Sequence, residues 1–183
     1  MNLTSGSRFG DKVDLGEMAA LTAGDLIYGA VTTGLPTALP IGSSAQVLQV
    51  VGGLPAWAAV GSSIVQGGFN TAVGAGTNYF EPMGPNMQSG STSTVNTPIP
   101  RAGTVSNFYV YVSTNSLAGT CTFTLNKNGS NQAVTVQYAA GGTTAQSDLT
   151  HSFSVAAGDL ICLGMVAVGA GSINSVRWGF LIT

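Results

Sequence analysis

The sequence has 183 residues, of which only 7% carry a charge, against roughly a quarter in an ordinary soluble domain. It is also 44% apolar with a net charge of -2; disorder usually combines low hydrophobicity with high net charge, so we expect a folded protein. The five basic residues are scattered, which argues against direct nucleic-acid binding. A nearly neutral surface provides little electrostatic repulsion between molecules, so the composition is typical of a protein that enters an assembly.

The first residues and the cysteines bear on compartment and redox state. Met1 to Thr4 contain no basic segment followed by an apolar stretch, and no apolar run approaches the roughly 20 residues that span a bilayer. We therefore expect a protein made in a cytosol and not inserted in a membrane. Cys121 and Cys162 lie in different apolar runs without Cys-x-x-Cys spacing. Buried free thiols are the favoured interpretation, with a disulfide as the alternative.

Residues 1–60 read as an extended arm that contains one short helix. Asp14 can cap the start of that helix, Glu17 stands three residues on, and apolar residues follow. A helix of a couple of turns is marginal alone, so its order must come from packing on something else.

Beyond this helix, three apolar runs at 26–28, 39–41 and 47–51 are separated by Gly and Pro. Each run is too short to build a core, so a second surface must compensate its backbone donors and its ordering entropy. We predict that the arm docks on a partner. The docking side chains are expected to be Phe9, Leu15, Leu26, Tyr28, Leu39, Ile41, Val47, Leu48 and Trp57.

Residues 61–183 have the pattern of an all-β domain. Residues 64–69 read as its first strand, 79–83 as a further extended piece and 84–100 as a long loop. Later strands are expected at 103–112, 119–127, 132–138, 149–155, 159–168 and 173–182. Short strands at such regular spacing indicate an antiparallel sandwich or barrel.

Period-two alternation assigns the faces of these strands. Phe108, Val110 and Val112 are expected on one face, as are Cys121, Phe123 and Leu125 in the next run. The run 160–166 is almost continuously apolar, which predicts a strand covered on both faces, with a neighbouring subunit as one candidate cover. The pentapeptide Ala-Gly-Asp-Leu-Ile occurs at 23–27 and at 157–161, and we interpret it as one turn-into-strand solution used twice.

The sequence offers few groups for catalysis. A glycosidase needs two carboxylates across a sugar, and Glu81, Asp148 and Asp159, the acidic residues of the β domain, read as turn and loop residues. His151 invites a hydrolase interpretation, but the motif of a nucleophile elbow is absent, and a surface or strand-face histidine is favoured. The Gly-rich stretches at 67–68, 74–76, 141–142 and 169–171 lack the ending of a phosphate loop and read as turns.

We therefore predict no enzyme activity, no cofactor and no resident metal. One alternative for a metal is that three copies of His151 gather an ion on a trimer axis. Five aromatic residues form a sugar-binding platform if they are exposed: Trp57, Trp178, Tyr109, Tyr111 and Tyr138. The favoured interpretation is core for Trp178 and a packed anchor for Trp57.

Two stretches resemble known families. Gly-Asp-Leu-Ile-Tyr-Gly, then Leu-Pro-Ile-Gly, then Gln-Val-Leu-x-Val-x-Gly-Gly-Leu-Pro-Ala-Trp, between Gly24 and Trp57, resemble a segment of tailed-bacteriophage fibre, appendage and decoration proteins. Pro-Arg-Ala-Gly-Thr-Val-Ser-Asn-Phe-Tyr-Val from Pro100, with Asn-Lys-Asn-Gly and Val-Ala-Ala-Gly-Asp-Leu-Ile further on, is similar to jelly-roll domains of phage appendages and of the complement C1q and tumour-necrosis-factor-like group.

These resemblances imply a trimeric virion protein, assembled in the cytoplasm of a host bacterium. The expected architecture is an arm of residues 1–60 that docks on a capsid or tail protein, followed by a jelly roll at 61–183. The short chain favours a capsid decoration protein or short head fibre. The alternative is a tail-fibre tip or baseplate receptor-binding protein that recognises host surface glycans. A third interpretation is an enzyme that acts on polysaccharide or peptidoglycan.

Overall fold

The computed structural model of the chain describes residues 22–29, 36–44, 46–59, 61–85 and 88–183. The chain divides into two compact units, residues 1–60 and residues 61–183. The helix expected near Asp14 lies outside the described residues. Among those that are described, no helix is long and apolar enough to cross a lipid bilayer.

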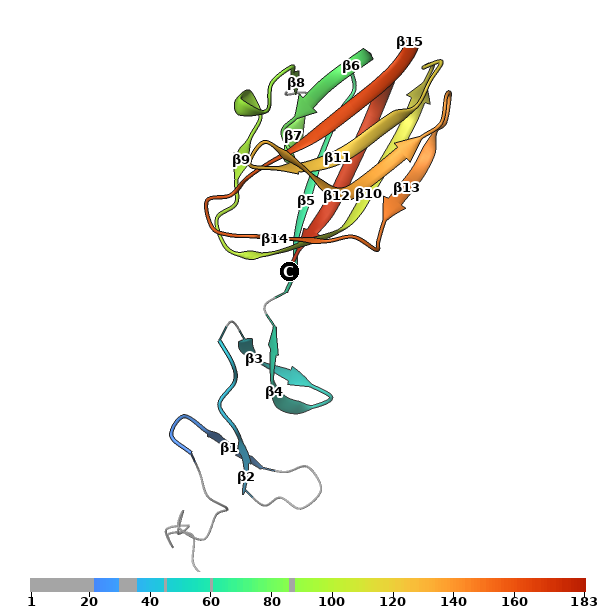
Figure 1. The fold of residues 1–183 in the computed structure, drawn as a ribbon. Helices are drawn as coiled ribbons and strands as arrows, with labels where there is room; N and C mark the ends of the chain where they lie inside the picture. The colour runs from blue at the N-terminus through green and yellow to red at the C-terminus, as the bar shows by residue number, and fades with distance from the viewer. Residues whose placement is uncertain (1–21, 30–35, 45, 60, 86–87) are drawn as a thin grey trace, which may run out of the picture. The chain divides into compact units, whose positions relative to one another are not determined.

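The described part of the first unit forms two antiparallel β-hairpins (Figure 1). Strand β1 (Leu26–Gly29) pairs with β2 (Pro36–Leu39), and β3 (Gln46–Val51) pairs with β4 (Leu54–Ala59). Gly52 and Gly53 join β3 to β4 with φ angles of +61° and +86°. A two-residue turn with two positive φ angles matches the twist of the flanking strands, which explains the Gly-Gly pair at this point.

The second unit is an antiparallel β domain with only one short 3₁₀ turn, Thr92–Thr94, among its described residues. Its strands are β5 (Ser63–Phe69), β6 (Val73–Phe80), β7 (Gly84–Pro85), β8 (Gln88–Ser89), β9 (Thr97–Pro98), β10 (Gly103–Asn115), β11 (Cys121–Lys127), β12 (Ser130–Tyr138), β13 (Thr144–Asp148), β14 (Phe153–Val155) and β15 (Leu160–Ile182). Strand β15 belongs to both layers of the domain. Figure 1 shows it turning back on itself at one end.

The turn in β15 divides the hydrogen-bonded network into two sheets. Residues 161–167 pair with β11 and β6, and residues 173–182 pair with β10 and β5, while Ser172 and Ile173 at the turn also pair with β6. Between these halves the register shifts, and Gly169 and Gly171 adopt positive φ angles of +85° and +104°. The β11 sheet therefore has the order β12, β11, first half of β15, β6, β8, and the β10 sheet has the order β13, β10, second half of β15, β5, β7.

This strand order is that of a jelly roll. Four principal strands lie in each sheet, and the chain passes from one sheet to the other between successive principal strands at every step except from β11 to β12, including the turn within β15. A jelly roll is a double sheet of eight strands connected in this manner. The predicted antiparallel jelly-roll sandwich is confirmed.

The core lies between the two sheets and follows the predicted alternation. On β10 the side chains of Phe108, Val110 and Val112 are buried, and the alternate residues of β11 are buried in the same way. The hydroxyl of Tyr138 on β12 donates to the carbonyl oxygen of Val110 across the core at 2.7 Å. Burying one apolar side chain of the size of Val110 or Phe108 contributes about 1.5–3 kcal/mol to stability.

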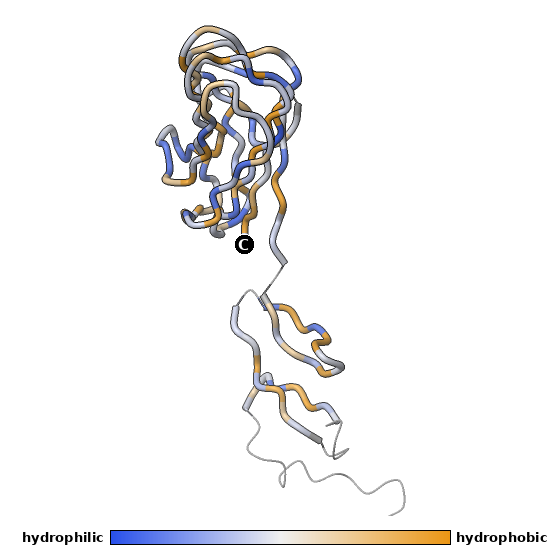
Figure 2. The backbone as a smooth tube through the Cα atoms, turned by 90° about the vertical axis from the view of Figure 1, so that its right-hand side faces the viewer, coloured by the Kyte–Doolittle hydropathy of each residue, from blue (hydrophilic) through white to orange (hydrophobic). Residues whose placement is uncertain are grey.

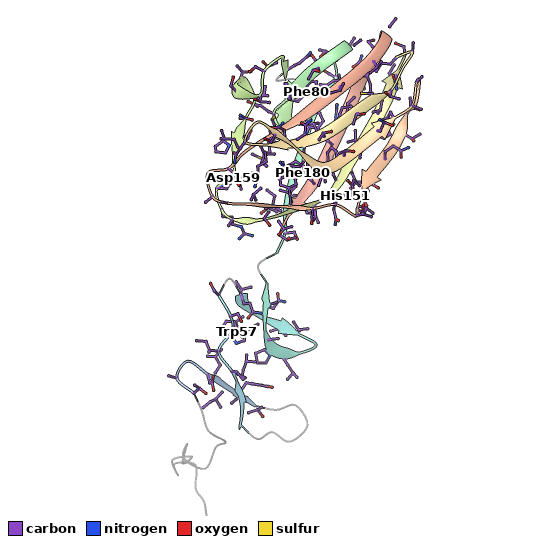
Figure 3. The ribbon with its side chains drawn as sticks, viewed as in Figure 1. Trp57, Phe80, His151, Asp159 and Phe180 are labelled. Carbon is purple, nitrogen blue, oxygen red and sulfur yellow. The ribbon has the colours of Figure 1, made fainter. Side chains whose placement is uncertain are left out.

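Aromatic rings fill one end of this core. The rings of Phe69 on β5 and Phe80 on β6 stack with their centroids 4.6 Å apart, and Trp178 on β15 lies 5.8 Å from Phe80. Figure 3 shows Phe80 and the equally buried Phe180 inside the domain. Trp178 is thus a core residue, as predicted.

The central strand β15 is covered on both faces, as its apolar run predicts. Residues 161–165 are all buried within a single chain. On the face away from the core, a Cβ placed on Gly164 would lie 3.4 Å from the Tyr79 ring of β6. The cover at this point therefore comes from the same chain and not from a neighbouring subunit.

Cys121 and Cys162 are free and buried, as predicted. Burial raises the pKa of the Cys121 thiol to about 12 and that of Cys162 to about 11, because a thiolate is poorly solvated in the core. Both thiols are therefore protonated and unreactive at neutral pH.

Several expectations about the strands are wrong. The stretch 84–100, expected as a long loop, contains the short strands β7, β8 and β9. The strand predicted at 149–155 is instead β13 at 144–148 and β14 at 153–155, separated by a loop. The Thr-Ala-Gln-Ser-Asp sequence of β13 shows no apolar alternation, because β13 is a solvent-facing edge strand of its sheet. Apolar patterning cannot detect such a strand.

The Gly-rich stretches at 67–68 and 74–76 are also not turns, because they lie in strands β5 and β6. A Cβ on Gly67 would lie 2.7 Å from the Trp178 ring, and one on Gly68 would lie 2.5 Å from the Val176 carbonyl oxygen. Glycine in a strand marks a close approach of this kind.

The repeated pentapeptide is one local structure used twice, as predicted. In the copy at 23–27, the Asp25 N–H donates to the Thr22 carbonyl oxygen at 3.1 Å, and the Thr22 N–H donates back to Asp25 Oδ2 at 2.9 Å. Gly24 has a positive φ of +97°. This turn ends where β1 begins.

The copy at 157–161 repeats every one of these features. The Asp159 N–H donates to the Ala156 carbonyl oxygen at 3.1 Å, and the Ala156 N–H donates to Asp159 Oδ2 at 2.8 Å. Gly158 has a φ of +89°, and β15 begins directly after the turn. An aspartate that accepts from the backbone of its own turn explains the shared sequence.

Candidate functional site

The β3–β4 hairpin presents apolar side chains to solvent. All six residues of β3 are exposed, although alternate residues of a strand point to opposite faces. The exposed fractions of Val47, Leu48, Val50 and Val51 are 45%, 47%, 75% and 54%. An antiparallel pair usually hides one apolar face, so both faces of β3 lack a cover among the residues that the structure describes.

The β1–β2 hairpin has the same character. Leu26 and Ile27 on β1 are exposed by 38% and 45%, and Ile41, just beyond β2, is exposed by 62%. Tyr28 and Leu39 are half-buried. Figure 2 shows apolar residues recurring along both hairpins.

Polar contacts hold the segment after β2 to both hairpins. Oδ1 of Asp25 accepts a hydrogen bond from the Ile41 N–H at 3.0 Å. The indole Nε1 of Trp57 donates to the Pro40 carbonyl oxygen at 2.7 Å. A Cβ on Gly42 would lie 2.5 Å from the Trp57 ring, so a glycine is required there. Trp57 (Figure 3) is therefore half-buried and packs on the segment that follows β2.

These contacts give a physical reason for the spacing of the motif between 24 and 57. Its three parts, Gly-Asp-Leu-Ile, Leu-Pro-Ile-Gly and Leu-Pro-Ala-Trp, are the segments that meet through Asp25, Ile41, Gly42 and Trp57. The polar and glycine positions of the motif fix the backbone, which leaves the apolar positions free to contact a partner.

The nine predicted docking residues fall into three groups. Phe9 and Leu15 lie outside the described residues; Leu26, Ile41, Val47 and Leu48 are exposed; and Tyr28, Leu39 and Trp57 are half-buried. Ile27, Val50 and Val51 are exposed apolar residues that the prediction did not include. Their apolar runs were recognised, but a sequence pattern does not say which face of an isolated hairpin stays uncovered.

The second unit has a groove on the outer face of its β10 sheet. Tyr109 and Tyr111 of β10 and Arg177 and Gly179 of β15 contribute to its lining, and its volume is about 410 Å³. Both tyrosines are 49% exposed, whereas Trp178 and Tyr138 are 4% and 2% exposed. Of the five aromatic residues considered as a sugar platform, only these two tyrosines form an exposed pair on one strand.

Asp148 and His151 form a second polar cluster, at the end of β13. Asp148 is buried and accepts hydrogen bonds from the N–H groups of Thr135, Thr150 and His151 at 3.0–3.1 Å. Nδ1 of His151 lies 2.9 Å from Asp148 Oδ2. Burial alone would raise the pKa of Asp148, but these hydrogen bonds outweigh it and hold the pKa well below its usual range.

The contacts of Asp148 and His151 hold the loop between β13 and β14 in place and are poorly suited to activating a nucleophile. The Asp148 carboxylate is already occupied by loop donors, and the His151 side chain is 57% exposed (Figure 3). That exposure agrees with the favoured interpretation of a surface histidine.

Asp159 and Glu81 complete the acidic residues of the domain. Asp159 (Figure 3) accepts from Asn128 Nδ2 at 2.8 Å and lies 3.6 Å from Lys127 Nζ. The Ala156 N–H, the Asn128 side chain and Lys127 lower the pKa of Asp159. Within the described part of the chain, no group of three or more His, Cys, Asp or Glu residues is placed to hold a metal ion.

Comparison with known proteins adds little to this description. No protein-family model matches the chain, and no curated protein matches it. Among solved structures, the chain is similar to a crystal structure of a Paenibacillus sp. cycloisomaltooligosaccharide glucanotransferase complexed with cycloisomaltoheptaose, with 15% identity and a TM-score of 0.27. That match takes in 48% of this chain and 12% of the other, and it carries no functional argument.

Proposed function

We propose that this chain is a structural protein of a bacteriophage virion, a homotrimer that docks through its N-terminal unit and displays a jelly roll. In this proposal it is a capsid decoration protein or short head fibre, and its activity is binding, without catalysis, cofactor or metal. The observation that carries the proposal is the apolar strand β3, whose residues are exposed on both faces. A chain that leaves such a strand uncovered is adapted to meet a partner.

The edge of β3 supplies direction to that contact. Within the described residues, β3 pairs with β4 alone, so its other edge presents unpaired N–H and C=O groups. An extended segment of a partner adds to such an edge by main-chain hydrogen bonds, while apolar pockets select its side chains. The expected partner is a major capsid or tail protein, in line with the family resemblance of residues 24–57, which is also the basis for the trimer.

Cryo-electron microscopy of the virion tests this role. Jelly rolls in groups of three on the capsid, with β3 against the shell, are expected. A double variant, Leu48→Asp with Val50→Asp, should lower occupancy by at least about ten-fold, because each lost apolar contact is worth about 1–3 kcal/mol. The matched control is Val166→Asp on the jelly roll, where the native valine is 45% exposed. Normal occupancy of the double variant would contradict the proposal.

A second candidate function is favoured by the groove beside Tyr109 and Tyr111. In this case the chain belongs to a tail-fibre tip or baseplate and recognises host surface glycans. Density restricted to the tail would replace the capsid assignment with this one. Density at neither place would remove both.

A further inference from the structure

The groove on the β10 sheet is built from two rows of paired strand positions. Tyr111 of β10 lies opposite Arg177 of β15, and Tyr109 lies opposite Gly179. On the far side of Gly179, Gln66 of β5 is its partner. Because Gly179 has no side chain, the sheet is hollow between Tyr109 and Gln66, and all five residues line the resulting groove.

The size of this hollow suits a small ligand. Its volume is about 410 Å³, within the roughly 300–1,000 Å³ typical of small-molecule sites. A Cβ on Gly179 would lie 3.4 Å from the Val65 carbonyl oxygen and 3.5 Å from Gln66 Cγ, which is ordinary contact. A larger side chain at this position therefore fills the floor without straining the sheet.

A β-bulge shapes one end of the groove. The register between β10 and β15 shifts between Ser106 and Tyr109, and Asn107 within the bulge adopts a φ of +53°. Asn107 also lines the groove. Bulges redirect side chains and occur preferentially beside functional sites, and a non-glycine residue at positive φ is uncommon enough to require a reason.

Arg177 gives the groove its charge. Its Nη1 donates to the carbonyl oxygens of Phe69 at 3.0 Å and Val176 at 2.8 Å, which fixes the guanidinium beside Gly68 of β5, at the Arg177 end of the groove. Among the described residues that line the groove none is acidic, and the ion pairs in that part of the chain are Lys127–Asp159 and His151–Asp148. A fixed guanidinium without a carboxylate partner is a site for a carboxylate or phosphate.

The charge also argues against a second copy of this face as the occupant. Two copies placed face to face would bring Arg177 toward another Arg177, and the groove supplies no acid to offset the repulsion. The tyrosine rings, half exposed and held on one strand, instead offer flat apolar faces with polar tips. An acidic sugar matches this groove, because it presents an apolar ring face to a tyrosine and a carboxylate to an arginine.

We propose that this groove binds an acidic oligosaccharide. Tyr109 and Tyr111 stack on pyranose rings, Arg177 pairs with a sugar carboxylate, and the amides of Gln66 and Asn107 bond to hydroxyl groups. The inference rests on the groove alone and not on the docking of the arm, so its test uses the isolated full-length protein.

Binding is measured by calorimetry with three acidic probes, tetragalacturonate, a tetramer of glucuronate and a tetramer of sialic acid, and with neutral maltotetraose. At least one acidic probe should bind more tightly than the neutral one by about ten-fold or more, because a charged hydrogen bond is worth about 1.5–3 kcal/mol. Arg177→Gln should remove that preference. The charge-matched control is Arg101→Gln, since Arg101 is exposed and does not line the groove.

Tyr109→Ala and Gly179→Val test the ring contact and the floor, and each should lower affinity at least about ten-fold. Circular dichroism verifies that each variant is folded. Two results would overturn the proposal. One is no binding of any acidic probe at about 10 mM, where a site with a Kd of about 1 mM is about nine-tenths filled. The other is self-association that Tyr109→Ala abolishes, which would assign the groove to a contact between copies.

Discussion

Two apolar strands of this chain have opposite surroundings. Strand β3 reads Gln-Val-Leu-Gln-Val-Val, and each of its residues is exposed. The first half of β15 reads Leu-Ile-Cys-Leu-Gly-Met, and five of its consecutive residues, 161–165, are buried. Both runs are apolar on both faces, yet within the described residues only the second is covered.

The difference shows what each unit needs in order to be stable. The jelly roll surrounds β15 with strands on both edges, β11 and β6, and with side chains on both faces. The hairpin of β3 has one partner strand, and an isolated two-stranded hairpin is at best marginally stable in water. The jelly roll is therefore a self-sufficient unit, and the N-terminal hairpins are expected to gain most of their stability from a partner.

The strongest test of this comparison removes the same side chain from both units. Leu125 on β11 is 0% exposed and Leu48 on β3 is 47% exposed. Leu125→Ala should destabilise the jelly roll by about 2–5 kcal/mol because it leaves a cavity in the core, whereas Leu48→Ala should change its stability by no more than about 0.5 kcal/mol.

The chain contains a convenient probe for this measurement. Its two tryptophans are Trp57 in the first unit and Trp178 in the jelly-roll core. In a Trp57→Phe background, fluorescence during urea unfolding reports the jelly roll alone. A loss of more than about 1 kcal/mol in Leu48→Ala would show that Leu48 stabilises the jelly roll and would contradict the expected contrast between β3 and β15.

The jelly roll contains a buried charge, the carboxylate of Asp148, so its stability depends on pH. The hydrogen bonds to Asp148 keep its pKa below the ordinary value, which is about 3.9 in an unfolded chain. As the pH falls below about 4, the unfolded chain takes up this proton before the folded protein does, so the stabilisation present at neutral pH is progressively lost.

Asp148→Asn should therefore cost about 1–3 kcal/mol at neutral pH, and the difference from wild type should shrink as the pH falls below about 4. Urea unfolding across this range measures it. Thr150→Val is the matched control, because it removes one donor at 3.1 Å and retains the carboxylate, so most of the pH dependence should persist. A constant difference at every pH would mean that Asp148 acts through its shape alone.

Much of the jelly roll was predictable from period-two alternation. The buried residues of β10 and β11 are those that alternation assigns to one face. Strand β13 escaped detection because Thr144 to Asp148 form a polar edge strand. The strand glycines were misread as turns, because the reason for Gly67, the Trp178 ring lying against it, is a contact between strands more than a hundred residues apart.

The candidate sites were predictable to a smaller extent. The sequence identified the apolar runs of the hairpins, but exposure depends on whether another segment covers them. It gave no sign that Tyr111 lies beside Arg177. The bulge at Asn107 has no local sequence signal, and it arises from the pairing of β10 with β15.

The repeated pentapeptide offers the subtlest comparison, because one local structure stands in both units. Asp25→Ala removes the acceptor that holds the Ile41 N–H, and Asp159→Ala removes the acceptor of the Ala156 N–H and of Asn128. Hydrogen exchange should rise across both hairpins in the first variant, because few other contacts hold that segment. In the second it should rise only near residue 156, because β15 is paired along both edges.

Docking on a partner should suppress the effect of Asp25→Ala and leave that of Asp159→Ala unchanged, since a partner stabilises only the unit that it contacts. Equal and local effects in the two free variants would show that the hairpins are as self-sufficient as the jelly roll, and the reason for expecting a docking partner would be lost.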